Sequence, residues 1–201
     1  MYIPNLFRID VEEEKISFMK RYSFASIITS KGNIPVATHL PFVVEQRDDQ
    51  LFLSSHFAKA NEHTTLIEAN PSLVIFAEPH AYISPQHYDK KLSVPTWDYI
   101  AIHAYGHARI IHDEAGKLST LEKMILSYDP AYQDQWNELP DKFKTGMLGG
   151  IVAFEIAVTE LQAQQKLSQN KTKEERARIV QQLNKSEHST EKDLAEYIRR
   201  L

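Results

Sequence analysis

Residues 54–61, Ser-Ser-His-Phe-Ala-Lys-Ala-Asn, combine the residue types that bind a phosphate group. The segment joins a predicted strand to residues with helical spacing, so hydroxyl groups, backbone N–H groups and an ammonium group are expected to converge at a helix start. That combination binds phosphate. An ordinary serine N-cap beside a solvated lysine also explains the pattern, and it is the interpretation that spacing alone favours. Both interpretations stay open.

A second candidate site lies between residues 82 and 107, where aromatic and histidine side chains gather. Aromatic rings bury a large area while their polar tips need hydrogen-bond partners. The cluster therefore favours a flat aromatic ligand or a subunit contact, although an aromatic-rich core with hydrogen-bonded tips is the equal alternative. Its members are Tyr82, His87, Tyr88, Trp97, Tyr99, His103, Tyr105 and His107.

Several kinds of catalytic and metal chemistry are excluded or unsupported. The chain has no cysteine, which excludes disulfides, zinc–thiolate sites and cysteine nucleophiles. On a predicted strand, His103 and His107 lie about 13 Å apart and cannot share one metal ion. Neither a phosphate-binding glycine loop nor a Gly-x-Ser-x-Gly elbow is present. We predict no catalytic residue and no metal ligand, and leave open haem ligation by one of the nine histidines.

Hydrophobic periodicity predicts an α+β fold: an antiparallel split β-barrel of about six strands, with peripheral helices and a helical C-terminus. Residues 98–111 give the clearest strand, because small apolar residues at even positions alternate with aromatic and basic residues at odd ones. Residues 166–171 are expected to be a polar linker. The expected strands are residues 24–29, 35–45, 51–54, 73–77, 81–84, 98–111 and 148–158. The expected helices are residues 10–21, 57–67 and 114–127, with two more that begin after Thr172 and Ser189. Residues 130–140 are expected to be irregular.

Length and charge predict one barrel domain, residues 1–165, followed by a C-terminal helical segment, residues 166–201. The net charge is −4, but the C-terminal segment holds nine basic and six acidic residues, a net +3. A basic segment can contact DNA, whereas mixed signs on a helix are more typical of a solvated face. The N-terminus lacks a secretory pattern, and no apolar run approaches the roughly 20 residues of a membrane span. A cytoplasmic protein is the expectation.

With these segments in place, the chain resembles the PaiB-type, FMN-binding-like negative transcriptional regulators of bacteria. The resemblance implies a flavin-reductase-like split barrel, usually a homodimer, and a role in repressing genes for protease synthesis and sporulation. The matching motifs are Ala-Thr-His-Leu-Pro at 37–41, His-Phe-Ala at 56–58 with Asn61, Tyr-Ile-Ser-Pro at 82–85, Val-Pro-Thr-Trp-Asp-Tyr at 94–99 with His103, and Lys-Leu-Ser-Gln-Asn at 166–170.

The resemblance also implies where FMN would bind, in a groove between two subunits. Ser54, Ser55 and Lys59 would hold the phosphate. The ribityl chain and ring would lie against Thr38, His39 and Leu40, and Trp97 and Tyr99 of the second subunit would close the groove. The remaining candidate residues are His56, Asn61 and His103.

Three alternatives stay open for the function. A bound flavin with an open ring would make the protein a flavin-dependent oxidoreductase, with His56, Tyr99 or His103 as the proton donor. A haem-binding split barrel is the second alternative. A regulator that binds DNA or a protein partner without flavin is the third, and the DNA contact could then be direct or indirect.

Overall fold

The computed structural model describes residues 1–201, whose contacts divide them into two units. Unit 1 comprises residues 1–15, 77–102 and 162–201, and unit 2 comprises residues 16–76 and 103–161. Strands β7 (Thr96–Ile111) and β8 (Ile151–Lys166), of 16 residues each, contribute to both units. Helix α1 (Glu12–Arg21) also begins in unit 1 and ends in unit 2.

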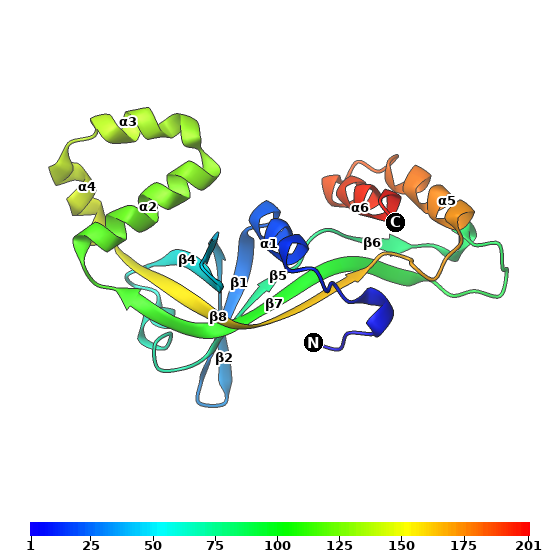
Figure 1. Cartoon of the computed structure of the whole chain (residues 1–201), viewed down its shortest axis with the longest axis horizontal. Coiled ribbons are helices and arrows are strands. Elements are labelled where there is room, and N and C mark those ends of the chain that lie inside the picture. Colours follow the sequence, from blue (N-terminus) through cyan, green and yellow to red (C-terminus); the bar gives the residue numbers. More distant parts are fainter. The chain divides into compact units, whose positions relative to one another are not determined.

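Unit 2 contains an antiparallel sheet with the strand order β2-β1-β5-β7-β8-β4-β3 (Figure 1). The hairpin between β1 and β2 turns at Gly32, whose φ of +63° suits a residue without a side chain. Strands β3 and β4 form a second hairpin. The remaining strands of this sheet are β1 (Phe24–Lys31), β2 (Ile34–Pro41), β3 (Val43–Arg47), β4 (Gln50–Ala58) and β5 (Ser72–Phe76).

The core of unit 2 is built around aromatic rings. Phe57 of β4 stacks on Phe154 of β8, with 4.6 Å between ring centroids, and Phe42 packs edge-on against Phe154. All three side chains are fully buried, and burying a phenylalanine contributes about 2 kcal/mol. These contacts fix the inward face of the sheet.

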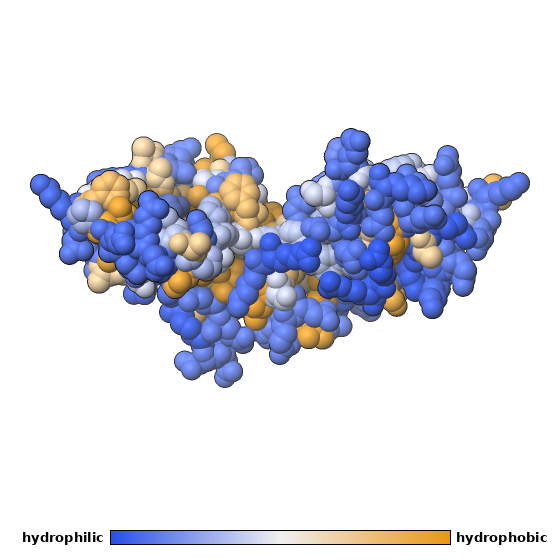
Figure 2. Space-filling model, turned by 90° about the horizontal axis from the view of Figure 1, so that it is seen from above, coloured by the Kyte–Doolittle hydropathy of each residue, from blue (hydrophilic) through white to orange (hydrophobic).

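Three consecutive helices follow β7 in unit 2 and fold back on one another (Figure 1). They are α2 (Glu114–Tyr128), α3 (Gln133–Glu138) and α4 (Asp141–Leu148), with a short 3-10 helix η4 (Pro130–Tyr132) after α2. Asp113 caps α2 by accepting a hydrogen bond from the backbone N–H of Gly116 at 2.7 Å. Figure 2 shows hydrophobic residues at the surface over these helices; the exposed ones are Leu126, Tyr128, Phe143 and Met147.

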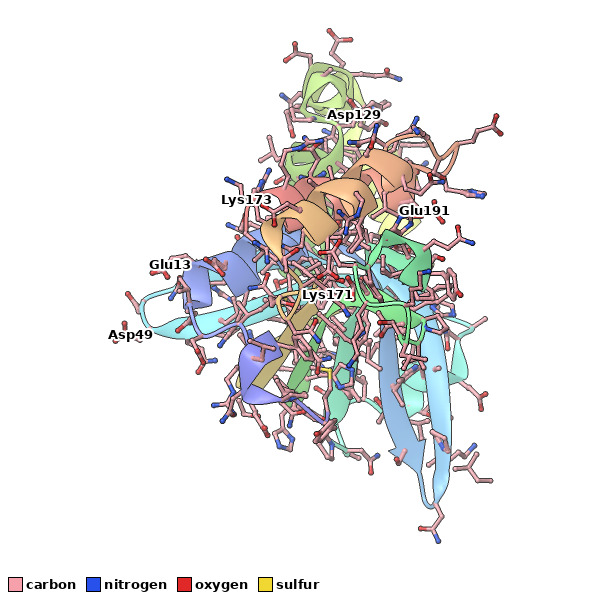
Figure 3. All side chains as sticks on the ribbon, turned by 90° about the vertical axis from the view of Figure 1, so that its right-hand side faces the viewer. Glu13, Asp49, Asp129, Lys171, Lys173 and Glu191 are labelled. Atoms are coloured by element: carbon pink, nitrogen blue, oxygen red, sulfur yellow. The ribbon has the colours of Figure 1, made fainter.

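Unit 1 combines a strand pair with two C-terminal helices. Strand β6 (His80–Ile83) pairs with the start of β7, and α6 (Ser189–Arg199) packs on β6 and on α5 (Lys173–Leu183) (Figure 3). Thr172 and Glu175 form a capping box at the start of α5. Unit 1 also contains the 3-10 helices η1 (Asn5–Phe7) and η3 (Pro85–His87). None of the helices combines the length and apolar character needed to cross a membrane.

The structure confirms the predicted α+β class, the hairpins, the long strand at 98–111 and the C-terminal helices. The alternation along β7 is also confirmed, because Ile100, Ile102 and Ala104 are buried while Tyr99, His103 and Tyr105 are half-buried. The sheet has eight strands rather than about six.

Two predicted elements are wrong. No α-helix spans residues 57–67, because the side chain of Phe57 is held in the core by Phe154 and β4 therefore continues to Ala58. Only the 3-10 helix η2 (Glu62–Thr65) follows it. Residues 130–140 are not irregular, since they contain α3, whose Trp136 is buried.

Candidate cofactor site

Strand β4 does not direct its two serines toward one ligand. Successive strand residues face opposite sides of a sheet, so Ser54 and Ser55 point in opposite directions. Both side chains are buried, and the Ser55 hydroxyl donates a hydrogen bond to the Pro41 carbonyl at 2.7 Å. Since no α-helix begins after β4, the expected convergence of Ser54, Ser55 and Lys59 at a helix N-terminus is not formed.

Lys59 instead lines a cavity of about 320 Å³ in unit 2. Lys117 contributes a second ammonium group from the first turn of α2, and His112 contributes an imidazole from just before that helix. Thr64 of η2 also lines the cavity. Two ammonium groups in one cavity attract an anion. The apolar part of the lining consists of Ile110, Ile111 and Val152.

No local pattern in the sequence indicates that Lys59, His112 and Lys117 lie around one cavity. More than 50 residues separate Lys59 from the other two. They come together because Lys59 follows β4, which pairs with β8, while His112 follows β7, which neighbours β8 in the sheet. Only the strand order places these three basic side chains around one cavity.

Thr38, Asn61 and His63 form a hydrogen-bonded group in unit 2. The Asn61 amide donates to the Thr38 hydroxyl at 3.3 Å, and that hydroxyl lies 3.0 Å from His63 Nδ1. Asn61 also accepts a hydrogen bond from the backbone N–H of His63 at 3.0 Å. His63, which sequence analysis missed, is fully buried, stacks on Phe57, and leaves Nε2 without a partner. Burial lowers its pKa, so the neutral imidazole is favoured.

The neighbouring residues of β2 present a mixed surface. His39 is exposed, and its Nδ1 lies 2.8 Å from the Ser26 hydroxyl. Phe24 stacks on the His39 ring at a centroid distance of 6.5 Å, and Leu40 is half-buried. Strand β2 therefore offers an aromatic and apolar surface next to the Thr38 group.

His56 and His103 of unit 2 each have a buried ring nitrogen without a hydrogen-bond partner. Each side chain is half-buried, and the unpartnered nitrogen is Nδ1 in both. Burial lowers the pKa of both imidazoles, which favours their neutral forms. A neutral imidazole nitrogen can accept a hydrogen bond from a ligand.

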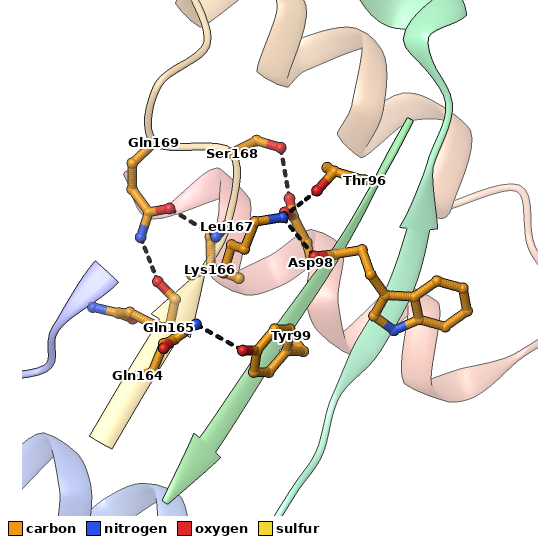
Figure 4. A network of polar contacts seen from close by, with 10 residues as sticks. Thr96, Asp98, Tyr99, Gln164, Gln165, Lys166, Leu167, Ser168 and Gln169 are labelled. Atoms are coloured by element: carbon orange, nitrogen blue, oxygen red, sulfur yellow. Dashed lines mark hydrogen bonds and ion pairs between the residues drawn. The ribbon is translucent and has the colours of Figure 1, made fainter. Parts of the chain in front are cut away.

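The two predicted aromatic residues, Trp97 and Tyr99, belong to unit 1. Trp97 is 50% exposed and packs against His80 and Tyr82, with ring centroids 5.7 Å and 6.2 Å away. The Tyr99 hydroxyl accepts a hydrogen bond from Gln164 at 2.7 Å (Figure 4). Trp97 thus keeps an accessible ring, while the polar tip of Tyr99 is already satisfied within unit 1.

Residues 166–171 are not a simple linker, because Lys166 ends β8 inside a polar network of unit 1 (Figure 4). Its ammonium group donates to the Thr96 hydroxyl and, at 2.7 Å, to the Trp97 carbonyl. It also lies 3.4 Å from the carboxylate of Asp98, which accepts a second hydrogen bond from Ser168 at 2.6 Å. Asp98 is fully buried, and burial raises its pKa despite these two partners.

Solved structures with the same fold include flavin-binding proteins. The FAD and heme binding protein from Mycobacterium smegmatis aligns with a TM-score of 0.62 at 14% identity, covering 79% of this chain and 73% of that one. The flavocytochrome Anf3 from Azotobacter vinelandii also gives 0.62, at 13% identity, covering 80% of this chain and 69% of that one. The fold is therefore the antiparallel split β-barrel expected from the sequence.

The chain belongs to the family of the putative FMN-binding domain, whose model matches residues 1–160. It is 36% identical over 200 residues to "Protease synthase and sporulation protein PAI 2" of Bacillus subtilis, covering 98% of this chain and 95% of that protein. The predicted PaiB-type membership is confirmed, and FMN is the cofactor that the family description names.

Proposed function

We propose that this protein is a homodimeric transcriptional regulator of the PaiB type that binds FMN, with the phosphate held in the cavity around Lys59. The observation that supports the regulatory role is the identity with the PAI 2 protein across nearly the whole length of both chains. The regulated genes would be those for protease synthesis and sporulation, as the resemblance implies.

The residues around the Lys59 cavity fit the phosphate end of FMN. Lys59 and Lys117 supply two positive charges, and the His112 ring supplies an N–H that can donate a hydrogen bond, whereas the Thr64 hydroxyl already donates to the Asn61 carbonyl at 2.8 Å. Ser55 is not part of this site, because its hydroxyl is already bonded to a backbone carbonyl. The phosphate site proposed here therefore keeps Lys59 from the sequence hypothesis and replaces the serine pair with His112 and Lys117.

FMN, when bound, supplies a flat ring that accepts and returns electrons. The chain's own contribution would be to position that ring. Leu40 and His39 offer an apolar and aromatic surface on β2, and Thr38 is held in place by Asn61 and His63. The Nδ1 atoms of His56 and His103 remain without hydrogen-bond partners in unit 2, and each donates or accepts according to the tautomer of its ring.

Affinity for FMN is tested by fluorescence titration of the purified full chain. A charge-assisted hydrogen bond contributes about 1.5–3 kcal/mol, so Lys59→Ala and Lys117→Ala should each weaken FMN binding by roughly 10- to 100-fold. Lys91→Ala, which removes an exposed lysine of unit 1, is the matched control. Riboflavin lacks the phosphate, so its affinity should be nearly the same for wild type and both cavity variants.

Three results would contradict this part of the proposal. They are an absence of saturable FMN binding at tens of micromolar, an equal loss in the Lys91 control, and an equal loss of riboflavin binding. The visible spectrum of the freshly purified protein separates the alternatives, because a haem absorption band in place of flavin bands would favour the haem hypothesis. Steady NAD(P)H oxidation by the FMN-loaded protein would favour the oxidoreductase hypothesis.

The proposed homodimer is supported by exposed apolar side chains on the strands of unit 2. Phe24 and Ile34 are 69% and 70% exposed, and large exposed apolar groups often mark an interface. In the dimer, Trp97 and Tyr99 of the second copy would close the FMN groove. Light scattering coupled to gel filtration measures the mass, and a single-chain mass at tens of micromolar would contradict the dimer.

Contact with DNA is proposed to involve the exposed basic residues of the C-terminal segment. Arg176 and Arg178 of α5 are engaged within unit 1, since they donate to the carbonyls of Lys171 and His87. Lys173, Lys185 and Lys192 remain exposed. A mobility shift with promoter DNA at physiological salt tests direct contact, and equal, strongly salt-dependent binding to any sequence would reject a specific operator.

A further inference from the structure

Unit 1 contains a cavity of about 190 Å³ that the FMN proposal does not use. Its lining residues come from the end of β8 and the segment that leads to α5, from the start of β7 with the two residues before it, and from Phe7 and Tyr88. The cavity is smaller than the 300–1,000 Å³ typical of drug-sized ligands. It is lined by Phe7, Tyr88, Val94, Pro95, Thr96, Asp98, Lys166, Ser168, Asn170 and Lys171.

The two lysines of this cavity differ in how their charges are balanced. Lys166 has three oxygen partners, including the buried carboxylate of Asp98. Lys171 forms no salt bridge, and its ammonium group lies 3.5 Å from the centroid of the Tyr88 ring. Lys171 also acts electrostatically on Glu175, which lies outside the lining, so its charge is partly offset from there. The lining itself holds two ammonium groups and one carboxylate, which favours an anion over a cation.

Tyr88 supplies an observation independent of charge. Its hydroxyl oxygen is buried and has no hydrogen-bond partner, although buried polar groups in folded proteins are nearly always paired. Leaving such a group unpaired costs about 1–3 kcal/mol. Burial and, after it, the negative charges of Asp98 and Glu175 raise the pKa of Tyr88, so the phenol keeps its proton and remains a donor. An anionic ligand in this cavity would give that donor an acceptor.

The remaining lining sets the shape of the ligand. Phe7, Val94 and Pro95 are apolar, and Asn170 adds an amide near Lys171 in sequence. Ser168 adopts a φ of +57°, which is uncommon for a residue with a side chain, and its hydroxyl is committed to Asp98. A small anion with an apolar group matches a cavity whose lining combines charged and apolar side chains.

We propose that this cavity is a second ligand site, which binds small carboxylates that carry an aromatic or aliphatic group. Lys171 and the Tyr88 hydroxyl would bind the carboxylate, and Phe7, Val94 and Pro95 would contact the apolar part. The site lies where the chain enters α5, so its occupant would also stabilise the attachment of that helix, whose Arg178 and Glu175 already bond to residues 87–89.

Benzoate is the probe, and saturable binding to the purified full chain is measured by calorimetry and by ligand-observed NMR. Benzamide and benzamidine have the same ring with a neutral and a cationic group, and both should bind at least tenfold more weakly. Lys171→Met should weaken benzoate binding about tenfold or more, and Tyr88→Phe, which removes only the hydroxyl, about threefold or more. Lys173→Met is the matched control, since Lys173 is exposed two residues further on.

The proposal is overturned by an absence of saturation up to about 10 mM benzoate, an affinity too weak to be specific. It is also overturned if benzamidine binds more tightly than benzoate, or if the Lys173 control loses as much affinity as the Lys171 variant. Should Lys171→Met fail to fold, Tyr88→Phe decides, because unchanged benzoate affinity in that variant contradicts the assigned role. FMN affinity should be unchanged in Tyr88→Phe, which keeps this test independent of the FMN proposal.

Discussion

Replacing Lys166 with methionine should destabilise the protein more at high pH than at low pH. The substitution keeps most of the side-chain volume and removes the ammonium group that faces Asp98 at 3.4 Å. Asp98 has a side chain with 0% exposure, and in the variant its carboxylate keeps only the hydrogen bonds from the hydroxyl and the backbone of Ser168. A buried carboxylate that loses its counter-charge is strongly unfavourable.

The size of the effect follows from the burial of the two partners. Removing one partner of a buried pair costs about 3–5 kcal/mol, and because 23% of the Lys166 side chain is exposed we expect the lower end, about 3 kcal/mol. Asp98→Asn keeps an oxygen that accepts from Ser168 and should cost about 1 kcal/mol. The variant that carries both Lys166→Met and Asp98→Asn should lose less stability than the sum of the two single losses, by a coupling free energy of about 1–2 kcal/mol.

The pH dependence follows from the raised pKa of Asp98. Burial raises the pKa in the folded state, so the folded protein binds the proton more tightly than the unfolded chain does. The stabilisation from this proton is fully present below the unfolded pKa of about 4 and is lost as the pH rises through the folded value. Lys166→Met raises the folded pKa further, so the variant should lose most stability near pH 8 and less near pH 5.

Urea unfolding at pH 5 and pH 8, followed by circular dichroism and tryptophan fluorescence, measures these free energies. Asp98→Asn is the matched control, because without the carboxyl group this part of the pH dependence disappears. An equal cost of Lys166→Met at both pH values would refute the reasoning, as would costs that simply add in the double variant.

Two further substitutions test the packing of each unit. In unit 2, Gly106→Ala would place a Cβ 2.3 Å from the Ala157 carbonyl oxygen, so we expect a loss of about 1–3 kcal/mol in thermal or urea unfolding, and an unchanged melting temperature would contradict the close approach of β7 and β8. In unit 1, Thr172→Ala removes the capping box of α5 and should cost about 1 kcal/mol, or about 2–4 °C in Tm. Thr172→Ser should restore most of that loss, and equal losses in both variants would show that the hydroxyl is not responsible.

Local signals in the sequence predicted most elements of the fold. The two-residue alternation of 98–111 and the Thr172–Glu175 capping box were both confirmed, because each depends on neighbours within one strand or one helical turn. The helix expected at 57–67 was wrong for the opposite reason. Its apolar spacing suits a helix, but the stacking of Phe57 on Phe154, nearly 100 residues later, holds the first part as a strand.

The candidate site was predicted less well than the fold. Sequence analysis identified Lys59, Thr38 and Asn61, and the structure joins the last two by a hydrogen bond. It treated Ser54 and Ser55 as a pair that binds one phosphate. They are consecutive residues of a strand, however, so their side chains lie on opposite faces of the sheet. It could not find Lys117 as a neighbour of Lys59, because no local pattern connects them.

The sequence by itself determined the α+β class, the family and the absence of cysteine chemistry, since these depend on periodicity, motifs and composition. The tertiary structure alone decided which side chains share a cavity. It placed Lys59 with Lys117, and it made the polar stretch at 166–171 part of the lining of a cavity beside Asp98. The physical reason is that antiparallel pairing joins residues far apart in the chain, and burial then decides which of their charges and hydrogen-bonding groups are satisfied and which remain available for a ligand.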